Sequence, residues 1–144
     1  MKTVLLVEDS DADVLFMKRA CRGADIPHTL KIVTDGQAAI DYLAGVKGYQ
    51  DRALNPLPDL VFLDVNLPLR SGHDVLKWLR SKEAFKSLPV IILAESANSP
   101  DIERAHALGV TSYLVKNSDP LEFCEGIRLV LRFWLQMNQA PANP

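Results

Sequence analysis

The stretch Thr3-Val4-Leu5-Leu6-Val7-Glu8-Asp9 decides the fold of this chain. Its first five residues form a nearly continuous apolar run, without the alternation of a half-exposed strand, which indicates a strand buried on both faces. Parallel sheets that are covered by helices contain such strands. Three other runs share this character and a further run does so more weakly; they lie at 59–64, 89–94, 111–116 and 30–33. The chain is therefore expected to form five buried strands.

Segments with helical periodicity separate these strands, at about 11–24, 37–45, 73–81, 100–108 and 120–137. Ser99-Pro100 and Asp119-Pro120 each place a capping residue before a proline, which is a typical helix start, and Gly109 is suited to end the fourth helix. The alternation predicts an α/β fold of the (βα)5 type, with a doubly wound, parallel, five-stranded sheet and right-handed crossovers. The segment 46–58, which is rich in Gly, Asn and Pro, is predicted to be a long surface loop.

Composition and charge exclude several classes of protein. The 144 residues suit one domain with a sizeable core. The net charge of −2 gives no electrostatic reason to expect nucleic acid or acidic lipid as a partner. No apolar run has the length of a membrane span, and the N-terminus shows no signal-peptide pattern. Cys21 and Cys124 form neither a CxxC pair nor a disulfide framework and are expected in the core, so we expect a cytoplasmic protein.

Acidic residues stand where the predicted strands end. Glu8 and Asp9 follow the first strand, and Asp64 ends the third. Sites in open α/β sheets form beyond the carboxyl ends of the strands, so these acids converge if the two strands are neighbours. Two like charges ~4 Å apart repel by roughly 4 kcal/mol at an effective dielectric of about 20, and such a cluster needs a cation. Hard oxygen ligands favour Mg²⁺, and Lys116, at the end of the fifth strand, adds a positive charge.

A simpler interpretation exists for each acid alone, because acids after strands often only cap the next helix. Four charged residues at the ends of three strands are harder to explain in this way. The stretches VLLVEDS (4–10), VFLDVNLP (61–68) with Gly72 after it, and YLVK (113–116) resemble the receiver domains of bacterial response regulators, in order and spacing. The resemblance implies a flavodoxin-like receiver with strand order 2-1-3-4-5. It also implies a receiver domain at 1–137, and we expect 138–144 to be a disordered tail.

The resemblance implies a role for each residue of the cluster. Asp64 is expected to accept a phosphoryl group from a histidine kinase, beside a Mg²⁺ ion held by Glu8 and Asp9. The backbone carbonyl of Asn66 is expected to complete the metal shell, and its side chain to tune the lifetime of the phosphate. Lys116 is expected to pair with the acceptor and then with the phosphoryl oxygens. Such a protein is not an enzyme, because it catalyses only its own phosphorylation and dephosphorylation.

The chain departs from the receiver pattern at the fourth and fifth strands. Most receivers carry Thr or Ser where this chain has Ala94, and the lost hydrogen bond to a charged group is worth ~1.5–3 kcal/mol. The bias toward an active state is then weaker by roughly 10- to 100-fold, which affects coupling to Tyr113, the usual switch aromatic. The resemblance also implies that Ser96 stands at a position that tunes phosphate lifetime in receivers. Asn117 stands where proline usually follows the lysine.

The departures leave an alternative open, a pseudo-receiver that acts as a scaffold or constitutive dimer with weakened switching. Enzymes of similar fold fit less well. A phosphatase with an aspartyl-phosphate intermediate would have an acid at position 66, where this chain has Asn66, and a dinucleotide enzyme would have G-x-G-x-x-G after the first strand.

Apolar residues outside the predicted core indicate partners. At the α-helical period, Met137 falls on the apolar face of the last helix that suits packing on the sheet. Leu129 and Phe133 extend this apolar arc beyond what packing on the sheet needs, which favours a homodimer interface; the alternative is that a loop or the tail covers them. The last helix, Leu67-Pro68 and the long loop resemble the regulators of cyanobacterial and bacterial phytochrome kinases. Leu15 lies opposite the apolar face of the first helix and is a candidate for kinase docking. His73 and His106 are expected on the surface.

Overall fold

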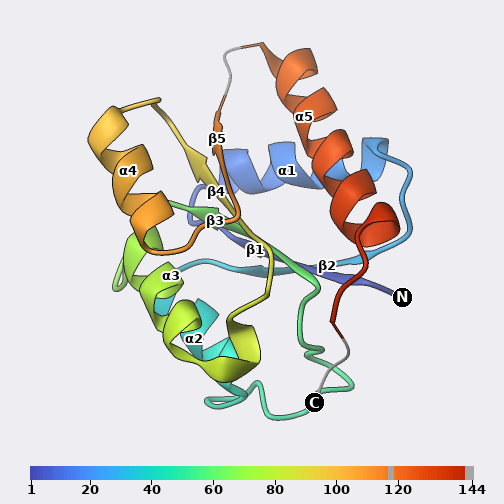
Figure 1. Ribbon diagram of the computed structural model, residues 1–144. Helices are drawn as coiled ribbons and strands as arrows, with labels where there is room; N and C mark the ends of the chain where they lie inside the picture. The colour runs from blue at the N-terminus through green and yellow to red at the C-terminus, as the bar shows by residue number, and fades with distance from the viewer. Residues whose placement is uncertain (117–118, 142–144) are drawn as a thin grey trace.

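The computed structural model describes residues 1–116 and 119–141, and the sheet is as predicted. Its five parallel strands are β1 (Thr3–Val7), β2 (Thr29–Val33), β3 (Leu60–Asp64), β4 (Val90–Ala94) and β5 (Ser112–Val115). They are ordered β2-β1-β3-β4-β5, which confirms the order 2-1-3-4-5 (Figure 1). Val7 lies opposite Val33 on one side and Leu63 on the other, so the carboxyl ends of the three strands reach the same edge.

Helices cover both faces of the sheet. They are α1 (Asp11–Gly23), α2 (Gly36–Ala44), α3 (Gly72–Ser81), α4 (Ser99–Ala107) and α5 (Pro120–Arg132). In Figure 1, α1 and α5 lie on one face, and α2, α3 and α4 lie on the other. A short 3₁₀ turn, η1 (Glu83–Phe85), follows α3, and a π-helical turn, η2 (Phe133–Met137), continues α5. The confirmed architecture is a doubly wound α/β sandwich.

The strand side chains divide between two apolar clusters. Val4 and Leu6 pack with α1 and α5, whereas Leu5 and Val7 pack with α2, α3 and α4. All five residues of β1 are buried. The absence of alternation in the sequence therefore has the predicted cause, which is burial of both faces of the strand.

Polar caps start the helices. Ser10 Oγ accepts a hydrogen bond from the Asp13 backbone N–H at 3.3 Å, and Asp119 caps α5 as predicted. The predicted cap of α4 was one residue late: Asn98 is the N-cap, and Ser99 is the first helical residue. Gly109 has a φ of +90°, in the left-handed region that allows the chain to turn after α4.

The loop between α2 and β3 is tied to the end of α2. Arg52 donates hydrogen bonds from Nη1 to the Tyr42 carbonyl and from Nη2 to the Leu43 carbonyl, both at 2.8 Å. The Tyr42 hydroxyl in turn donates to the Pro56 carbonyl at 2.7 Å. The loop predicted at 46–58 contains no helix or strand, but it is fastened to the core.

Two predictions about single residues were wrong, and two others concern residues that lie wholly or partly outside the described ranges. His73 is buried at 3% exposure instead of lying on the surface, because it falls on the inner face of α3. Met137, which the periodicity placed on the buried face of the last helix, is 60% exposed after the change to π-helical geometry. Asn117 and the end of the predicted tail, 142–144, lie outside the described residues. Among the described residues no helix is long and apolar enough to cross a membrane.

Candidate phosphoacceptor and metal site

Three carboxylates meet at the carboxyl edge of the two central strands. Glu8 follows β1, and Asp64 is the last residue of the neighbouring strand β3. One carboxylate oxygen each from Glu8, Asp9 and Asp64 lies within 4.8 Å of the others. Glu8 and Asp64 are buried at 1% and 6% exposure, whereas Asp9 is exposed. The cluster thus has a buried inner wall and an open outer side, as a site on a rim requires.

Gly72 fixes the position of Asp64 from the side of α3. A Cβ atom on residue 72 would lie 2.3 Å from the Asp64 carbonyl oxygen and 2.9 Å from the Val65 Cα. The Gly72 backbone N–H donates to the Val65 carbonyl at 2.9 Å. This close approach of two backbones needs a residue without a side chain.

Lys116 brings a cation to the buried side of the cluster. Its Nζ lies 2.9 Å from Glu8 Oε1, 2.9 Å from Asp13 Oδ2 and 3.4 Å from Asp64 Oδ1. Burial alone would lower the pKa of Lys116, but hydrogen bonds to Asp13 and Glu8 and the charge of Asp64 outweigh it and raise the pKa. Lys116 is therefore a permanent cation that four carboxylates share, since Glu95 Oε1 also lies 3.6 Å away.

Sequence reasoning missed two of these partners, Asp13 and Glu95. Glu95 directly follows β4, so the rule that drew attention to acids after strands could have found it. Asp13 lies in the first turn of α1, and only its distance from Lys116 distinguishes it from an ordinary helix-start acid. The hydrogen bond from Lys116 lowers the pKa of Asp13, although burial opposes the shift.

The folded structure raises the pKa of the buried Glu8 carboxyl group. Burial, and after it a hydrogen bond with Asp64, raises the pKa of Glu8 from 4.5 to about 8, against the opposing effect of Lys116. The fold thus favours the neutral carboxyl over the carboxylate. A raised pKa in the folded state means that this group favours folding below pH 4.5 and loses that contribution as the pH rises toward about 8.

Glu8→Gln is expected to stabilise the protein when a chelator keeps metal ions away. Gln has the shape of the neutral acid, so the free energy of unfolding at pH 8 should rise by roughly 1–3 kcal/mol. Urea denaturation at several pH values measures the effect, which should shrink as the pH falls toward 5. Glu103→Gln, an exposed change on α4, is the matched control and should alter stability by less than ~0.5 kcal/mol. Equal stability of Glu8→Gln and the wild type at pH 8 would contradict the prediction.

The predicted switch residues lie at the ends of β4 and β5. Ala94 ends β4 and is buried at 4% exposure, and its carbonyl accepts the Lys116 backbone N–H at 2.6 Å. The partly buried Tyr113 donates from its hydroxyl to the Ser96 carbonyl at 3.2 Å. Ala94 has no side-chain hydrogen-bonding group, so the only polar atoms that β4 offers at this point are backbone atoms.

The remaining predicted residues lie at the surface. Leu15 is 50% exposed, Leu129 is 53% exposed and Phe133 is 46% exposed. Asn66 is exposed in the loop that follows β3, two residues beyond Asp64. The alternative that a loop or the tail covers Leu129 and Phe133 does not agree with these exposures.

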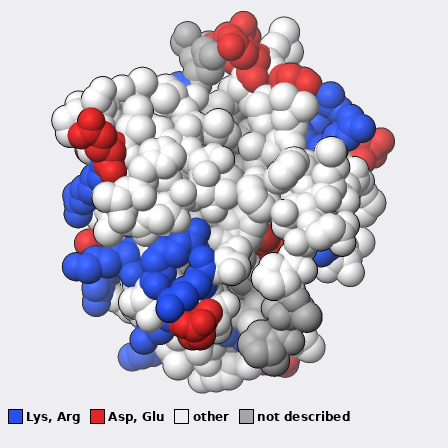
Figure 2. Space-filling view, viewed as in Figure 1, with Lys and Arg blue, Asp and Glu red and all other residues white. Residues whose placement is uncertain are grey.

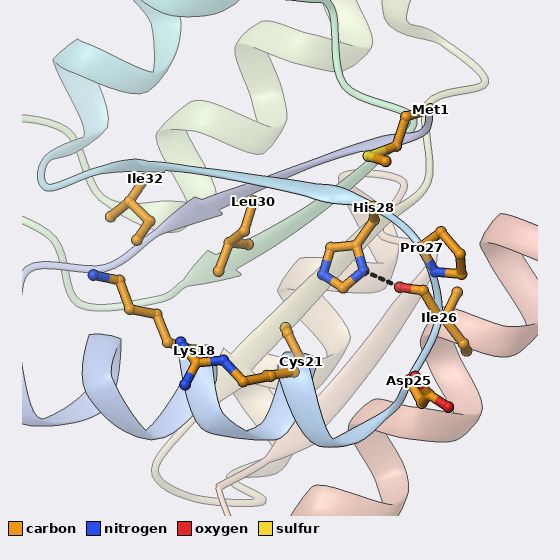
Figure 3. A pocket seen from close by; sticks show the side chains of 10 residues that line it. Met1, Lys18, Cys21, Asp25, Ile26, Pro27, His28, Leu30 and Ile32 are labelled. Carbon is orange, nitrogen blue, oxygen red and sulfur yellow. Dashed lines mark hydrogen bonds between the residues drawn. The ribbon is translucent and has the colours of Figure 1, made fainter.

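A separate hollow of about 560 Å³ lies between the second half of α1 and the edge strand β2 (Figure 3). Lys18, Cys21, His28 and Leu30 are among its lining residues, and His28 Nδ1 lies 2.6 Å from the Ile26 carbonyl oxygen. Burial raises the pKa of Cys21 to about 12, so this thiol stays protonated at neutral pH. The hollow shares no residue with the acidic cluster and contains no reactive thiolate.

The fold and the cluster together define a class: α/β proteins with an acidic centre and a lysine at the carboxyl edge of a five-stranded parallel sheet. Residues 4–128 match the response regulator receiver domain, and the chain belongs to this family. The chain is 33% identical to response regulator Rcp1 of Synechocystis sp. over 141 residues, which cover 98% of this chain and 94% of that protein.

Solved structures agree with this assignment. The crystal structure of response regulator RPA3017, in red light signaling of R. palustris, has a TM-score of 0.91 at 34% identity and covers 99% of both chains. The phosphorylated cyanobacterial phytochrome response regulator RcpA has a TM-score of 0.88 at 33% identity, with 98% of this chain and 99% of that chain covered. The Mn²⁺-bound form of Rcp1 also has a TM-score of 0.88 at 33% identity, with 99% and 100% covered. The chain is thus similar to phytochrome response regulators over nearly its whole length.

Proposed function

We propose that this chain is a response regulator that accepts a phosphoryl group from a histidine kinase on Asp64, with Mg²⁺ bound beside it. One observation carries the proposal: Glu8, Asp9 and Asp64 offer oxygens within 4.8 Å of one another, and Lys116 Nζ lies 3.4 Å from Asp64. The similar structures include one described as phosphorylated and one described as Mn²⁺-bound, which supports both parts of the proposal.

The donor set fits a hard divalent cation. All three side chains offer carboxylate oxygens, and the exposed Asp9 leaves the outer side of the cluster open to water, as Mg²⁺ prefers. We assign Glu8, Asp9, Asp64 and the backbone carbonyl of Asn66 as the residues that would hold the ion. When bound, Mg²⁺ supplies positive charge beside the phosphoryl oxygens.

The acceptor chemistry belongs to Asp64. A carboxylate oxygen of Asp64 forms a bond to phosphorus, the P–N bond of the phosphohistidine breaks, and the imidazole leaves with the bonding electron pair. Lys116 lies close enough to pair with the phosphoryl oxygens, and Gly72 holds the acceptor in place. Such a transfer depends on positioning and charge more than on covalent help from other groups. Asn66 and Ser96 are assigned to tuning the lifetime of the phosphate.

Signalling after phosphorylation would depend on β4 and β5. Because Ala94 offers no hydroxyl, the coupling between the phosphoryl group and Tyr113 is expected to be weaker than in receivers with Thr or Ser there. The pseudo-receiver alternative rests on this one residue. Glu8, Asp9, Asp64 and Lys116 form an intact cluster, which favours phosphoryl acceptance over that alternative.

The proposed partners are a histidine kinase and a second copy of the chain. Because the chain is similar to phytochrome response regulators, we propose that the kinase is a phytochrome. Leu15, exposed on α1, is assigned to kinase docking. We propose that the receiver unit spans 1–137, acts in the cytoplasm and signals through protein contacts, without a nucleic acid or a membrane as partner.

The homodimer interface is assigned to Leu129 and Phe133. Leu121 and Met137, at the two ends of the same helical segment, are exposed as well, at 82% and 60%. Figure 2 shows few charged side chains on the surface between α4 and α5 in this view. Exposed apolar side chains on a surface with few charges commonly mark a protein interface.

Phe133→Glu, with Leu129→Glu, is expected to convert a dimer into a monomer, because burying two unpaired carboxylates in an interface is costly. Size-exclusion chromatography with light scattering, with and without acetyl phosphate, measures the change. Leu54→Glu is the matched control, since Leu54 is also an exposed leucine, at 66%, but lies in the loop after α2. A dimer that persists in the double variant would show that another surface forms the interface.

The phosphorylation proposal is tested with acetyl phosphate and Mg²⁺. Intact-mass spectrometry should show the gain of one phosphoryl group, which a chelator prevents, and borohydride reduction followed by peptide mapping should place it on Asp64. No gain of mass with Mg²⁺ bound, from several phosphodonors including a phytochrome kinase, would overturn the proposal and favour the pseudo-receiver.

A further inference from the structure

Lys116 has its shortest contacts with residues other than the acceptor. Its Nζ lies 2.9 Å from Glu8 and 2.9 Å from Asp13, but 3.4 Å from Asp64. An ammonium group has three donors, so each carboxylate that it contacts competes with the others for them. Asp13 therefore competes with the acceptor for the lysine.

Asp13 does not have the usual role of an acid at its helical position. In α3, Asp74 is the third helical residue and accepts from the backbone N–H of the N-cap Ser71, which completes a capping box. In α1, Asp13 is likewise the third helical residue after the N-cap Ser10. Ser10 Oγ accepts from the Asp13 N–H, but Asp13 directs its Oδ2 to Lys116. The side chain of Asp13 is thus used for the lysine instead of for the cap.

The surroundings leave room for Lys116 to change partners. Asp13 and Lys116 line a hollow of about 320 Å³ between α1 and α5, with Phe16 and Phe123 among its apolar walls. The side chain of Asp13 is 39% exposed, so water can solvate its carboxylate after the lysine has left. The contact can therefore be broken without leaving a buried charge unpaired.

We propose that Asp13 is a positioning residue that holds Lys116 partly away from Asp64 until a phosphoryl group draws the lysine across. This inference rests on the proposed function and adds a regulator of the same site. Asp13 lowers the affinity of the site for a phosphoryl group in two ways, by competing for Lys116 and by adding a negative charge. Transfer of the lysine also releases the first turn of α1 from its side-chain contact with the end of β5.

The test measures how tightly the Mg²⁺-loaded protein binds beryllofluoride, a stable phosphoryl mimic. Fluorine NMR monitors the binding. Asp13→Asn should bind it more tightly than the wild type, by about 3- to 10-fold. Asp11→Asn is the matched control, because it removes a negative charge from the same turn of α1. Unlike Asp13, Asp11 forms no ion pair with Lys116 among the described residues. Asp13→Glu should restore binding close to that of the wild type. Calorimetry with Mg²⁺ alone separates effects of the substitutions on metal binding from their effects on beryllofluoride binding.

The outcomes distinguish this inference from the proposed function. Tighter binding by Asp13→Asn than by Asp11→Asn, with rescue by Asp13→Glu, supports the positioning role. Equal binding by the two Asn variants, or weaker binding by Asp13→Asn, overturns it, since a purely structural role would only weaken the site. Failure of the wild type to bind beryllofluoride although it binds Mg²⁺ would overturn the proposed function itself.

Discussion

Asp64→Asn should accept no phosphoryl group from acetyl phosphate and Mg²⁺ under conditions that fully modify the wild type. An amide oxygen is a far weaker nucleophile than a carboxylate, and Lys116 cannot compensate because it holds no electron pair to donate when protonated. Intact-mass spectrometry over time measures the loss. The variant should stay folded, because it removes one charge from a cluster of like charges around Lys116.

The matched control is Asp59→Asn, at the residue directly before β3 and so at the opposite end of the strand from Asp64. Asp59 Oδ2 accepts from the Thr3 backbone N–H at 2.8 Å, and Oδ1 lies 4.0 Å from Lys2 Nζ. This variant should lose some stability but be phosphorylated like the wild type. Phosphorylation of Asp64→Asn at the rate of the wild type would mean that a different residue is the acceptor.

Gly72→Ala should lower the free energy of unfolding by about 3 kcal/mol and slow phosphorylation as well. The added Cβ would lie 2.3 Å from the Asp64 carbonyl oxygen and 2.9 Å from the Val65 Cα, and both are backbone atoms that no side-chain rotation can move away. The end of β3 must shift, and it carries the acceptor with it. Urea denaturation gives the stability, and the acetyl phosphate reaction gives the rate.

Gly126→Ala is the same substitution at a different site, and it is expected to change the free energy of unfolding in the opposite direction. Gly126 lies within α5, and a Cβ there would meet nothing within 4 Å. Alanine in a helix interior is favoured over glycine by roughly 0.5–1 kcal/mol, so this variant should be more stable than the wild type. If Gly72→Ala is as stable as Gly126→Ala, then the close approach of α3 to β3 does not constrain the acceptor.

The fold could be predicted largely from local patterns. Strands buried on both faces lack alternation, and helices show their own period, so the order of elements follows from runs such as Thr3–Val7. The order of the strands in the sheet did not follow from periodicity, because the residues of one strand do not specify which strands pair with it. It came from the resemblance to receivers, which the structure confirms.

Local patterns were less informative where burial depends on neighbouring elements. His73 is a polar residue near a helix start, and such a residue is usually exposed. It is buried here because the first turn of α3 packs closely against the end of β3, as the contact of Gly72 with Asp64 shows. Met137 differs for a related reason, since the π-helical turn changes the angle between successive side chains after Arg132.

The sequence by itself determined the alternation of strands and helices and the acids and lysine at the strand ends, because both are encoded in short segments. Only the tertiary structure decided how the lysine is shared. Asp13 and Lys116 are 103 residues apart, and their 2.9 Å contact depends on how α1 and β5 pack across the sheet edge. The Asp13 side chain points toward this distant lysine and not toward the cap of its own helix. This direction depends on the interactions of the assembled site. The residues of that site come from several segments of the chain, so no single segment determines it.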